Sequence, residues 1–290
     1  MEWVNVLVQG ALLGGLYALM AAGLSLAFGI MRIVNVAHGD LSVLAAYLAL
    51  VVVATTGINP LLSIVIVAPV MFITGYLLQR GILNYSLPGG VMPPLLVTFG
   101  LSVVIQNVLL EVFSADNRGL RSGAFEGSSI RVTDQLAVGW LPLVTFLSAV
   151  VILLGLQLTF RGTMLGRAFR ATADDQQAAQ LMGIDNRHLY AVAMGIALAT
   201  VAVAGVFLGL RTTFQPASGP AFLLFAFESV VIGGLGSLWG TLVGGIILGI
   251  AQTVGAHLNP GWGALSGHLV FLAVLAFRPT GLFARGVRFA

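Results

Sequence analysis

Hydrogen-bonding and ionisable side chains occur at three places inside the most apolar stretches of this chain. Only 8% of the residues are charged. The three groups are Asn35, His38 and Asp40 within VNVAHGD, Gln106 and Asn107, and Glu228 within FLLFAFESVVIGG. Polar groups at membrane depth are costly and usually face a pathway or the interior of a helix bundle. These six residues are therefore candidates for the wall of a solute pathway.

The first group, VNVAHGD, allows two interpretations. Gly39 predicts a helix break at which unwound backbone and the start of the next helix could bind the charged end of a small solute. Alternatively, Asn35 and Asp40 cap the following helix, while His38 hydrogen-bonds across to the preceding one. The sequence leaves both interpretations open.

Composition shows what kind of element must position these groups. Of 290 residues, 58% are hydrophobic and the mean hydropathy is +1.02, which no water-soluble domain of this size tolerates. A helix needs roughly 20 apolar residues to cross a membrane. Such segments recur near 3–30, 35–54, 60–78, 94–113, 138–160, 189–210, 221–235, 238–256 and 264–277. We predict a single all-α transmembrane domain over 1–290 with eight or nine crossings.

Two of these segments could be partial or re-entrant. The segment 35–54 is interrupted at its start by VNVAHGD, and 221–235 is short. The stretches GLSLAFGIMRIVNVAHGD and GVFLGLRTTFQPASGP both run from a helix into a polar break and then into another apolar helix. Paired interruptions of this kind are typical of internally repeated transporters.

Several kinds of chemistry are excluded or disfavoured by residue content. The chain has no cysteine, so it has no disulfides and no thiolate ligands. All 13 basic residues are arginine, so the lysine of a nucleotide-binding P-loop is absent. Its four histidines lack metal-ligand spacing, and the arginines are too dispersed for nucleic-acid binding. We therefore expect no catalytic residue, no metal site and no cofactor in the chain itself.

Two long polar loops give the orientation. Arginines are concentrated in the loop 161–188 and near the C-terminus, so the positive-inside rule makes both cytoplasmic. The loop 114–137 is then external, and the N-terminus lies outside. This external loop also contains three arginines, which the positive-inside rule does not predict there: Arg118, Arg121 and Arg131.

The cytoplasmic loop predicts a short helix over 172–183. Thr172 is its expected N-cap, and Asp174 and Asp175 fall in the first turn, where the helix dipole favours negative charge. Gly183 stands where a left-handed residue ends a helix, and Asp185 is the expected cap of the next membrane helix.

This short helix also carries a small apolar face, made of Ala178, Ala179, Leu181 and Met182. Such a face fits a groove on another protein, or it lies on lipid headgroups. The residues alone favour neither.

Four stretches of the chain resemble the permease subunits of branched-chain amino-acid type ABC importers. They are AAGLSLAFGIMRIVNVAHGDLSVLAAY, GRAFRATADDQQAAQLMGID, VVIGGLGSLWGTLVGGIILG and FRPTGLF, which together span residues 21 to 283. The resemblance implies the ABC importer permease fold in a bacterial inner membrane. It makes 172–183 a coupling helix that docks on a partner ATPase, which binds the ATP and Mg²⁺.

Further partners follow from the same resemblance. It implies a second permease subunit, either a paralogue or another copy, and a periplasmic substrate-binding protein. Arg118, Arg121 and Arg131 could pair with acidic residues of that binding protein, or the external loop is simply solvated.

One position departs from the family pattern. Members often carry a lysine and, three residues later, a small or apolar residue, where this chain has Phe225 and Glu228. Glu228 could attract the ammonium or amide of a different solute, or it is paired near the end of the short segment. The expected solutes are therefore hydrophobic amino acids or related small molecules such as an amide, urea or a carboxylate.

The predicted mechanism is alternating access driven by the partner ATPases. An alternative from another class is an ion-coupled secondary transporter that uses Asp40 or Glu228 as its ion site. A passive channel is a third possibility, in which the capped cytoplasmic helix has no evident use.

Overall fold

The computed structural model describes residues 2–123, 127–133 and 136–283. Within these residues, nine helical segments are long and apolar enough to cross a membrane. Their main helices are α1 (Glu2–Met31), α2 (His38–Thr56), α3 (Pro60–Leu78), α5 (Met92–Phe113), α7 (Trp140–Gly162), α10 (Asn186–Arg211), α11 (Gly219–Gly233), α12 (Leu238–Leu258) and α13 (Gly263–Phe277). The predicted all-α, multi-pass class is confirmed.

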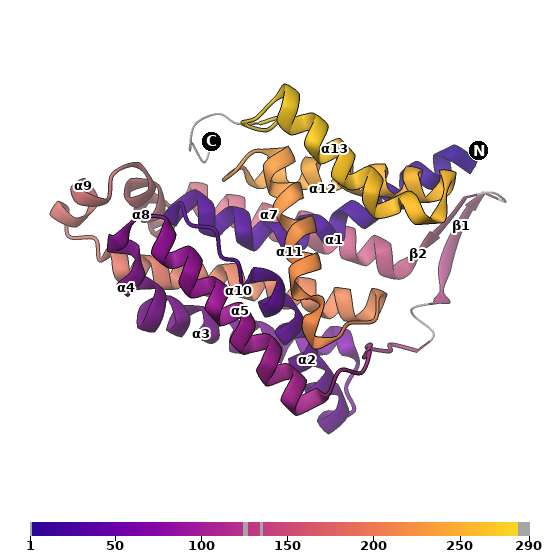
Figure 1. Ribbon diagram of the computed structural model, residues 1–290, viewed down its shortest axis with the longest axis horizontal. Helices are drawn as coiled ribbons and strands as arrows, with labels where there is room; N and C mark the ends of the chain where they lie inside the picture. The colour runs from indigo at the N-terminus through magenta and orange to yellow at the C-terminus, as the bar shows by residue number, and fades with distance from the viewer. Residues whose placement is uncertain (1, 124–126, 134–135, 284–290) are drawn as a thin grey trace.

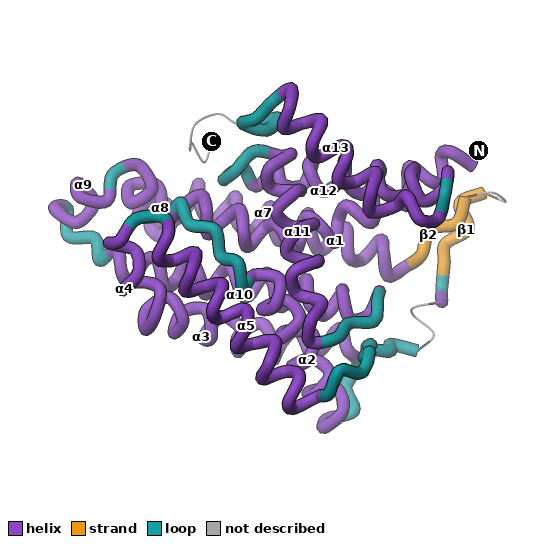
Figure 2. The backbone as a smooth tube through the Cα atoms, in the orientation of Figure 1, coloured by secondary structure: helices purple, strands orange, loops and turns teal. Residues whose placement is uncertain are grey.

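Shorter elements connect these helices (Figure 2). They are η1 (Gln79–Leu83), α4 (Asn84–Ser86), η2 (Leu87–Gly89), α8 (Met164–Asp174), α9 (Gln176–Leu181), η3 (Pro216–Ser218) and η4 (Pro260–Trp262). The long polar loop 114–137 leads into elements that the sequence did not predict, an antiparallel pair of strands β1 (Ser129–Thr133) and β2 (Leu136–Gly139). The pair lies beside the N-terminus, and α8 and α9 lie at the opposite end of the molecule (Figure 1).

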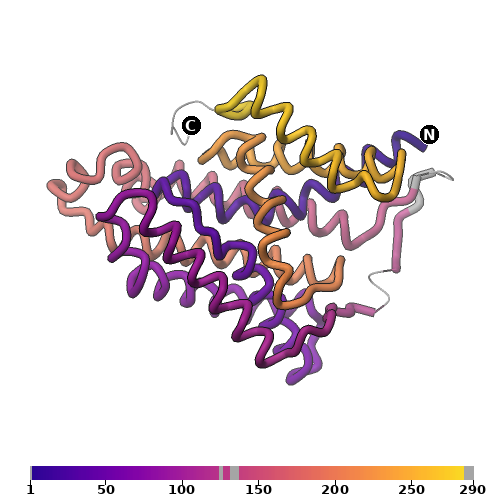
Figure 3. The backbone as a smooth tube through the Cα atoms, viewed as in Figure 1, coloured from indigo at the N-terminus to yellow at the C-terminus, as the bar shows by residue number. Residues whose placement is uncertain are grey.

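The most buried helices, α1 and α10, form the centre of the bundle. Helix α1 packs most extensively along α12, and α10 packs most extensively along α3. Both central helices end in a non-helical stretch, 32–37 after α1 and 212–215 after α10, before the next helix begins. Each of the two interruptions seen in the sequence therefore follows one of the two central helices, as the course of the chain in Figure 3 shows.

Small residues allow the central helices to approach closely. A Cβ atom on Gly245 of α12 would lie 2.6 Å from the carbonyl oxygen of Gly14 in α1, and one on Gly249 would strike that of Gly10. Close helix contact in lipid depends on such residues. The glycine-rich face of α12 is thus a packing surface against α1.

Helix α11 has an unusual direction. It runs across α1 and α12 instead of along them, from the start of α2 toward α13 (Figure 1). By contrast, α5 and α13 lie at the periphery, where most of their surface is unburied. Helix α11 therefore links the central helices to α13.

Candidate functional site

The stretch VNVAHGD follows α1 and leads the chain back into the helix bundle as α2. The Nε2 atom of His38 lies 2.8 Å from the carbonyl oxygen of Met20, and the imidazole is buried. Met20 precedes the end of α1 by 11 residues, so this contact lies about 16 Å back along α1. The expected hydrogen bond from His38 to the preceding helix is confirmed, and it holds the break deep inside the protein.

Asn35 shapes the turn that enters α2. Its Oδ1 atom accepts a hydrogen bond from the amide of Ala37 at 3.0 Å, and its carbonyl accepts one from the amide of His38 at 3.2 Å. Asn35 therefore supports the start of α2, although the residue directly before the helix is Ala37, which makes no side-chain cap.

Asp40 does not cap α2, which corrects one of the two interpretations from the sequence. Its Oδ2 atom accepts a 2.5 Å hydrogen bond from Ser102, and its Oδ1 atom accepts a 3.0 Å bond from Gln106. The carboxylate is buried, and both donors lie on α5. Asp40 thus connects the break to α5.

Ser102 was missed from the sequence, and Asn107 was wrongly grouped with Gln106. Ser102 lies one helical turn before Gln106, so the two share a face that meets Asp40. Asn107 is exposed on another face of α5 and donates to the carbonyl of Val103 at 2.8 Å. The i, i+4 spacing was the available signal for Ser102.

The two breaks meet at a glycine pair. A Cβ atom on Gly39 would strike the carbonyl oxygen of Gly219, and one on Gly219 would strike the carboxylate of Asp40. Gly39 itself is helical, in the first turn of α2, so the break predicted there lies just before it, at residues 32–37. The N-terminal ends of α2 and α11 thus lie against each other beside Asp40.

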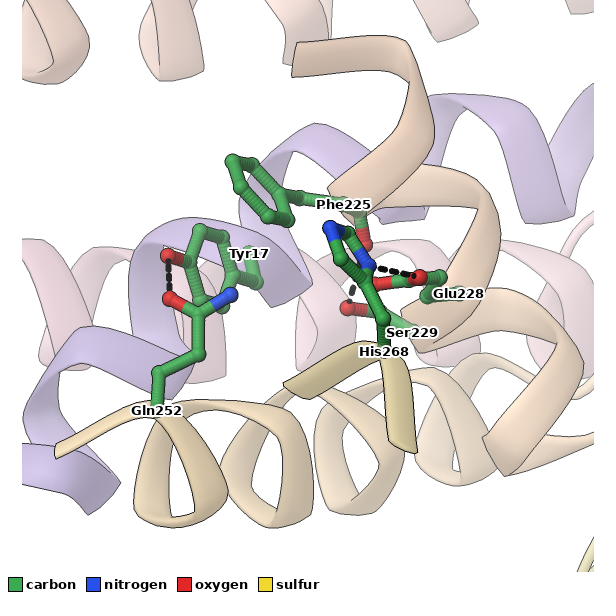
Figure 4. Close-up of polar contacts among 6 residues, drawn as sticks. All are labelled: Tyr17, Phe225, Glu228, Ser229, Gln252 and His268. Carbon is green, nitrogen blue, oxygen red and sulfur yellow. Dashed lines mark hydrogen bonds and ion pairs between the residues drawn. The ribbon is translucent and has the colours of Figure 1, made fainter. Parts of the chain in front are cut away.

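Glu228 belongs to a second polar cluster, shown in Figure 4. It lies nine residues after Gly219 on α11, about 14 Å further along the helix. Its Oε1 atom lies 2.5 Å from Nδ1 of His268 on α13, and its carboxylate is buried. Glu228 is therefore paired, as one of the two sequence interpretations held, and it is separate from Asp40.

The cytoplasmic segment contains two helices where the sequence suggested one. Thr172 is not an N-cap, because α8 continues through it, and its hydroxyl donates to Oδ1 of Asn186 at 3.2 Å. Asp174 is the last residue of α8 and so lies outside the first turn of α9. The cap of α9 is Asp175, whose Oδ1 atom accepts from the amides of Gln177 and Ala178. A cap three residues earlier, at Thr172, fails because RAFRATAD is itself amphipathic and helix-forming.

The other end of this segment agrees with the sequence. Gly183 has a φ of +84°, the left-handed value expected there, and the Asp185 side chain accepts from the amide of His188 at 3.1 Å. The apolar face is divided, since Ala179 is buried, whereas Leu181 and Met182 are 89% and 83% exposed. The tip of α9 thus presents two bare apolar side chains.

Two of the three external arginines, Arg118 and Arg121, have described side chains. Arg118 pairs with Asp116 at 3.4 Å, and its backbone forms a bridge with Phe214. Arg121 is exposed, and the side chain of Arg131, on β1, lies outside the described residues. Among the residues that the structure describes, no group of three or more His, Asp or Glu side chains could hold a metal ion.

Comparison with known proteins decides the family. A family model described as "Branched-chain amino acid transport system / permease component" matches residues 6–276. The chain belongs to this permease family. The permease is therefore a multi-pass ABC transport subunit and not an enzyme.

Two relatives match the permease over nearly its whole length. It is 29% identical to the high-affinity branched-chain amino acid transport system permease protein BraD of Pseudomonas aeruginosa, with 98% of this chain and 96% of that protein covered. It is 30% identical to the corresponding LivH protein of Escherichia coli, with the same coverage. Among solved structures, PsaBC from Streptococcus pneumoniae in complex with Fab gives a TM-score of 0.46 at 14% identity, covering 93% of this chain and 91% of that one.

Proposed function

We propose that this permease imports hydrophobic amino acids, with branched-chain amino acids as the first candidates. The observation that carries the proposal is the match to BraD and LivH over 96% of their length. Related small solutes, such as an amide, urea or a carboxylate, form a wider class because of Glu228. The protein would act in the bacterial inner membrane by alternating access.

Movement would be driven by a partner ATPase that docks on α9 and binds the ATP and Mg²⁺. Leu181 and Met182 support this role, because exposed apolar side chains at the cytoplasmic end need a groove to cover them. Helix α8 is linked to the start of the break, since Nη2 of Arg32 donates to the carbonyl of Ala173 at 3.3 Å. A push on α9 would therefore reach residues 32–37 and Asp40.

Two further partners complete the proposed importer. A second permease subunit, a paralogue or a second copy, would cover the peripheral face of α5, where the exposed Asn107 amide is a poor neighbour for lipid. A periplasmic binding protein would dock at the end that carries β1 and β2, near Arg118 and Arg121.

Reconstitution tests this function. We expect vesicles containing the permease, its partner ATPases, the second permease and the binding protein to take up L-leucine only when ATP is supplied. Uptake of L-leucine by the permease alone under a proton or sodium gradient would overturn the proposal and support an ion-coupled transporter using Asp40 or Glu228.

A further inference from the structure

Three buried polar atoms without a hydrogen-bond partner in the described part of the chain belong to residues that interact with Tyr17. They are Nε2 of Gln252, Oε2 of Glu228 and Nη1 of Arg211. The Tyr17 hydroxyl is hydrogen-bonded to Oε1 of Gln252 and lies within electrostatic range of both Arg211 and Glu228. The unsatisfied atoms are thus associated with one tyrosine.

The residues of this Tyr17 cluster come from four different helices. Tyr17 lies on α1, Gln252 on α12, and Glu228 with Phe225 on α11 (Figure 4). Arg211 is the last residue of α10. Tyr17 and Gln252 are 7% and 8% exposed, and Glu228 is 1% exposed. Three polar side chains of the cluster are thus buried inside the bundle.

His268 on α13 holds the carboxylate in one orientation. It binds Oε1 of Glu228 and so leaves Oε2 as the free acceptor. The imidazole also stacks on the ring of Phe225, with ring centres 5.9 Å apart and planes 7° apart. His268 is therefore a positioning residue for Glu228.

The unpaired atoms include both hydrogen-bond donors and an acceptor, which suggests a ligand that carries groups of both kinds. Gln252 and Arg211 offer N–H donors, one of them cationic, whereas Glu228 offers a carboxylate acceptor. The aromatic rings of Phe225 and Tyr17 lie beside them, with centres 5.3 Å apart, and aromatic faces attract cations. Buried polar groups are almost always paired, so each of these atoms requires a partner.

We propose that the Tyr17 cluster is an intramembrane site for the zwitterionic end of an amino acid. Glu228 and the ring of Phe225 receive the α-ammonium group, and Gln252 with Arg211 receives the α-carboxylate group. The proposal builds on the proposed function and adds the class of ligand and the residues that select it. None of these contacts involves the side chain of the amino acid. The site therefore recognises the α-ammonium and α-carboxylate groups.

The site is tested by direct binding measurements on the intact permease–ATPase complex in lipid nanodiscs. The binding protein is left out, because its own selectivity would mask that of the site. Three probes separate the two charges: L-leucine, L-leucinamide, which lacks the carboxylate, and 4-methyl-2-oxopentanoate, which lacks the ammonium. We expect Glu228→Gln to weaken L-leucine and L-leucinamide binding by about 10- to 100-fold and to leave the oxo acid unchanged. We expect Gln252→Leu to weaken L-leucine and the oxo acid and to leave L-leucinamide unchanged.

Controls distinguish recognition from folding. Two variants repeat the same chemical changes outside the cluster: Glu111→Gln, at an exposed glutamate of α5, and Gln9→Leu, near the start of α1. Both should leave the binding of all three probes unchanged. Phe225→Leu preserves an apolar core residue and should weaken only the two probes that carry an ammonium group. This variant keeps the test available if Glu228→Gln does not assemble.

The outcomes separate this site from the proposed function. Equal weakening of all three probes by both variants, no weakening, or no probe bound to the wild-type complex would overturn the site. ATP-driven leucine uptake that survives these results would leave the proposed function standing. If each variant weakens only the probes that carry the group it binds, but no ATP-driven uptake is seen, the site would be supported and the proposed function overturned.

Discussion

Gly219 and Gly39 are the residues at which the N-terminal ends of α2 and α11 touch. A methyl group on Gly219 would overlap the Asp40 carboxylate and lie 2.7 Å from the Asp40 amide nitrogen. We predict that Gly219→Ala lowers the free energy of unfolding by about 2 kcal/mol, the usual range for overpacking a core. Thermal unfolding of the purified permease, followed by size-exclusion chromatography with fluorescence detection, measures the change.

Gly155 provides a matched control for that substitution. It lies inside α7, and a Cβ atom there would meet nothing within 4 Å. Gly155→Ala should be neutral or raise stability by up to about 1 kcal/mol, because alanine favours the helix. If Gly219→Ala behaved like Gly155→Ala, the close contact between α2 and α11 would be wrong.

Residue-scale chemistry was only partly predictable from the sequence. The left-handed Gly183 and the Asp185 cap depend on local geometry, so a short window of sequence contains the information. The partners of Asp40 and Glu228 do not, because Ser102 and His268 are 62 and 40 residues away and meet them only through the packing of α5 and α13. The sequence marked these acids as unusual but could not say what they bind.

At the scale of elements, the N-cap of α9 gives a local prediction. Asp175→Ala removes two hydrogen bonds to the first amides of α9 and should destabilise that helix by about 1 kcal/mol. Hydrogen exchange at Gln177 and Ala178 should accelerate several-fold. Asp174→Ala, next in the chain but at the end of α8, should leave those rates unchanged. Equal acceleration in both variants would mean that Asp175 is not the cap.

The exposed tip of α9 tests the proposed coupling. Leu181→Asp adds a charge to a side chain that makes little contact within this chain, so folding should be retained. We predict loss of ATP-driven uptake and of ATPase stimulation in reconstituted vesicles. Met164→Asp, an exposed apolar residue at the start of α8, is the control and should keep most activity. Normal coupling in Leu181→Asp would remove α9 as the docking element.

The helices themselves were predictable because long apolar runs are an unambiguous signal in a membrane protein. The strands β1 and β2 were not, because SIRVT and LAVG have only five and four residues, too few for a clear alternating pattern. Thr172 misled for a related reason. A capping residue starts a helix only where the preceding chain is not already helical, and there α8 continues through it.

The whole molecule offers a direct test of orientation. The chain contains no cysteine, so a single introduced cysteine is the only thiol. We predict that Arg121→Cys reacts with a membrane-impermeant maleimide in intact spheroplasts, whereas Met182→Cys reacts only after the membrane is opened. Both side chains are exposed in the structure. The reverse labelling pattern would invert the assignment of the 114–137 loop as external and the 161–188 loop as cytoplasmic.

The direction of α11 has a consequence for how distant parts of the protein respond to one another. This helix is continuous from Gly219, beside Asp40, through Glu228, which holds α13. A stiff rod of that kind transmits tilt, so a swing of roughly 10° about one end moves a point about 14 Å away by about 2 Å. A displacement of α11 at the contact between Gly219 and Gly39 would therefore also move the Glu228 carboxylate, because Gly219 and Glu228 lie on one rigid helix.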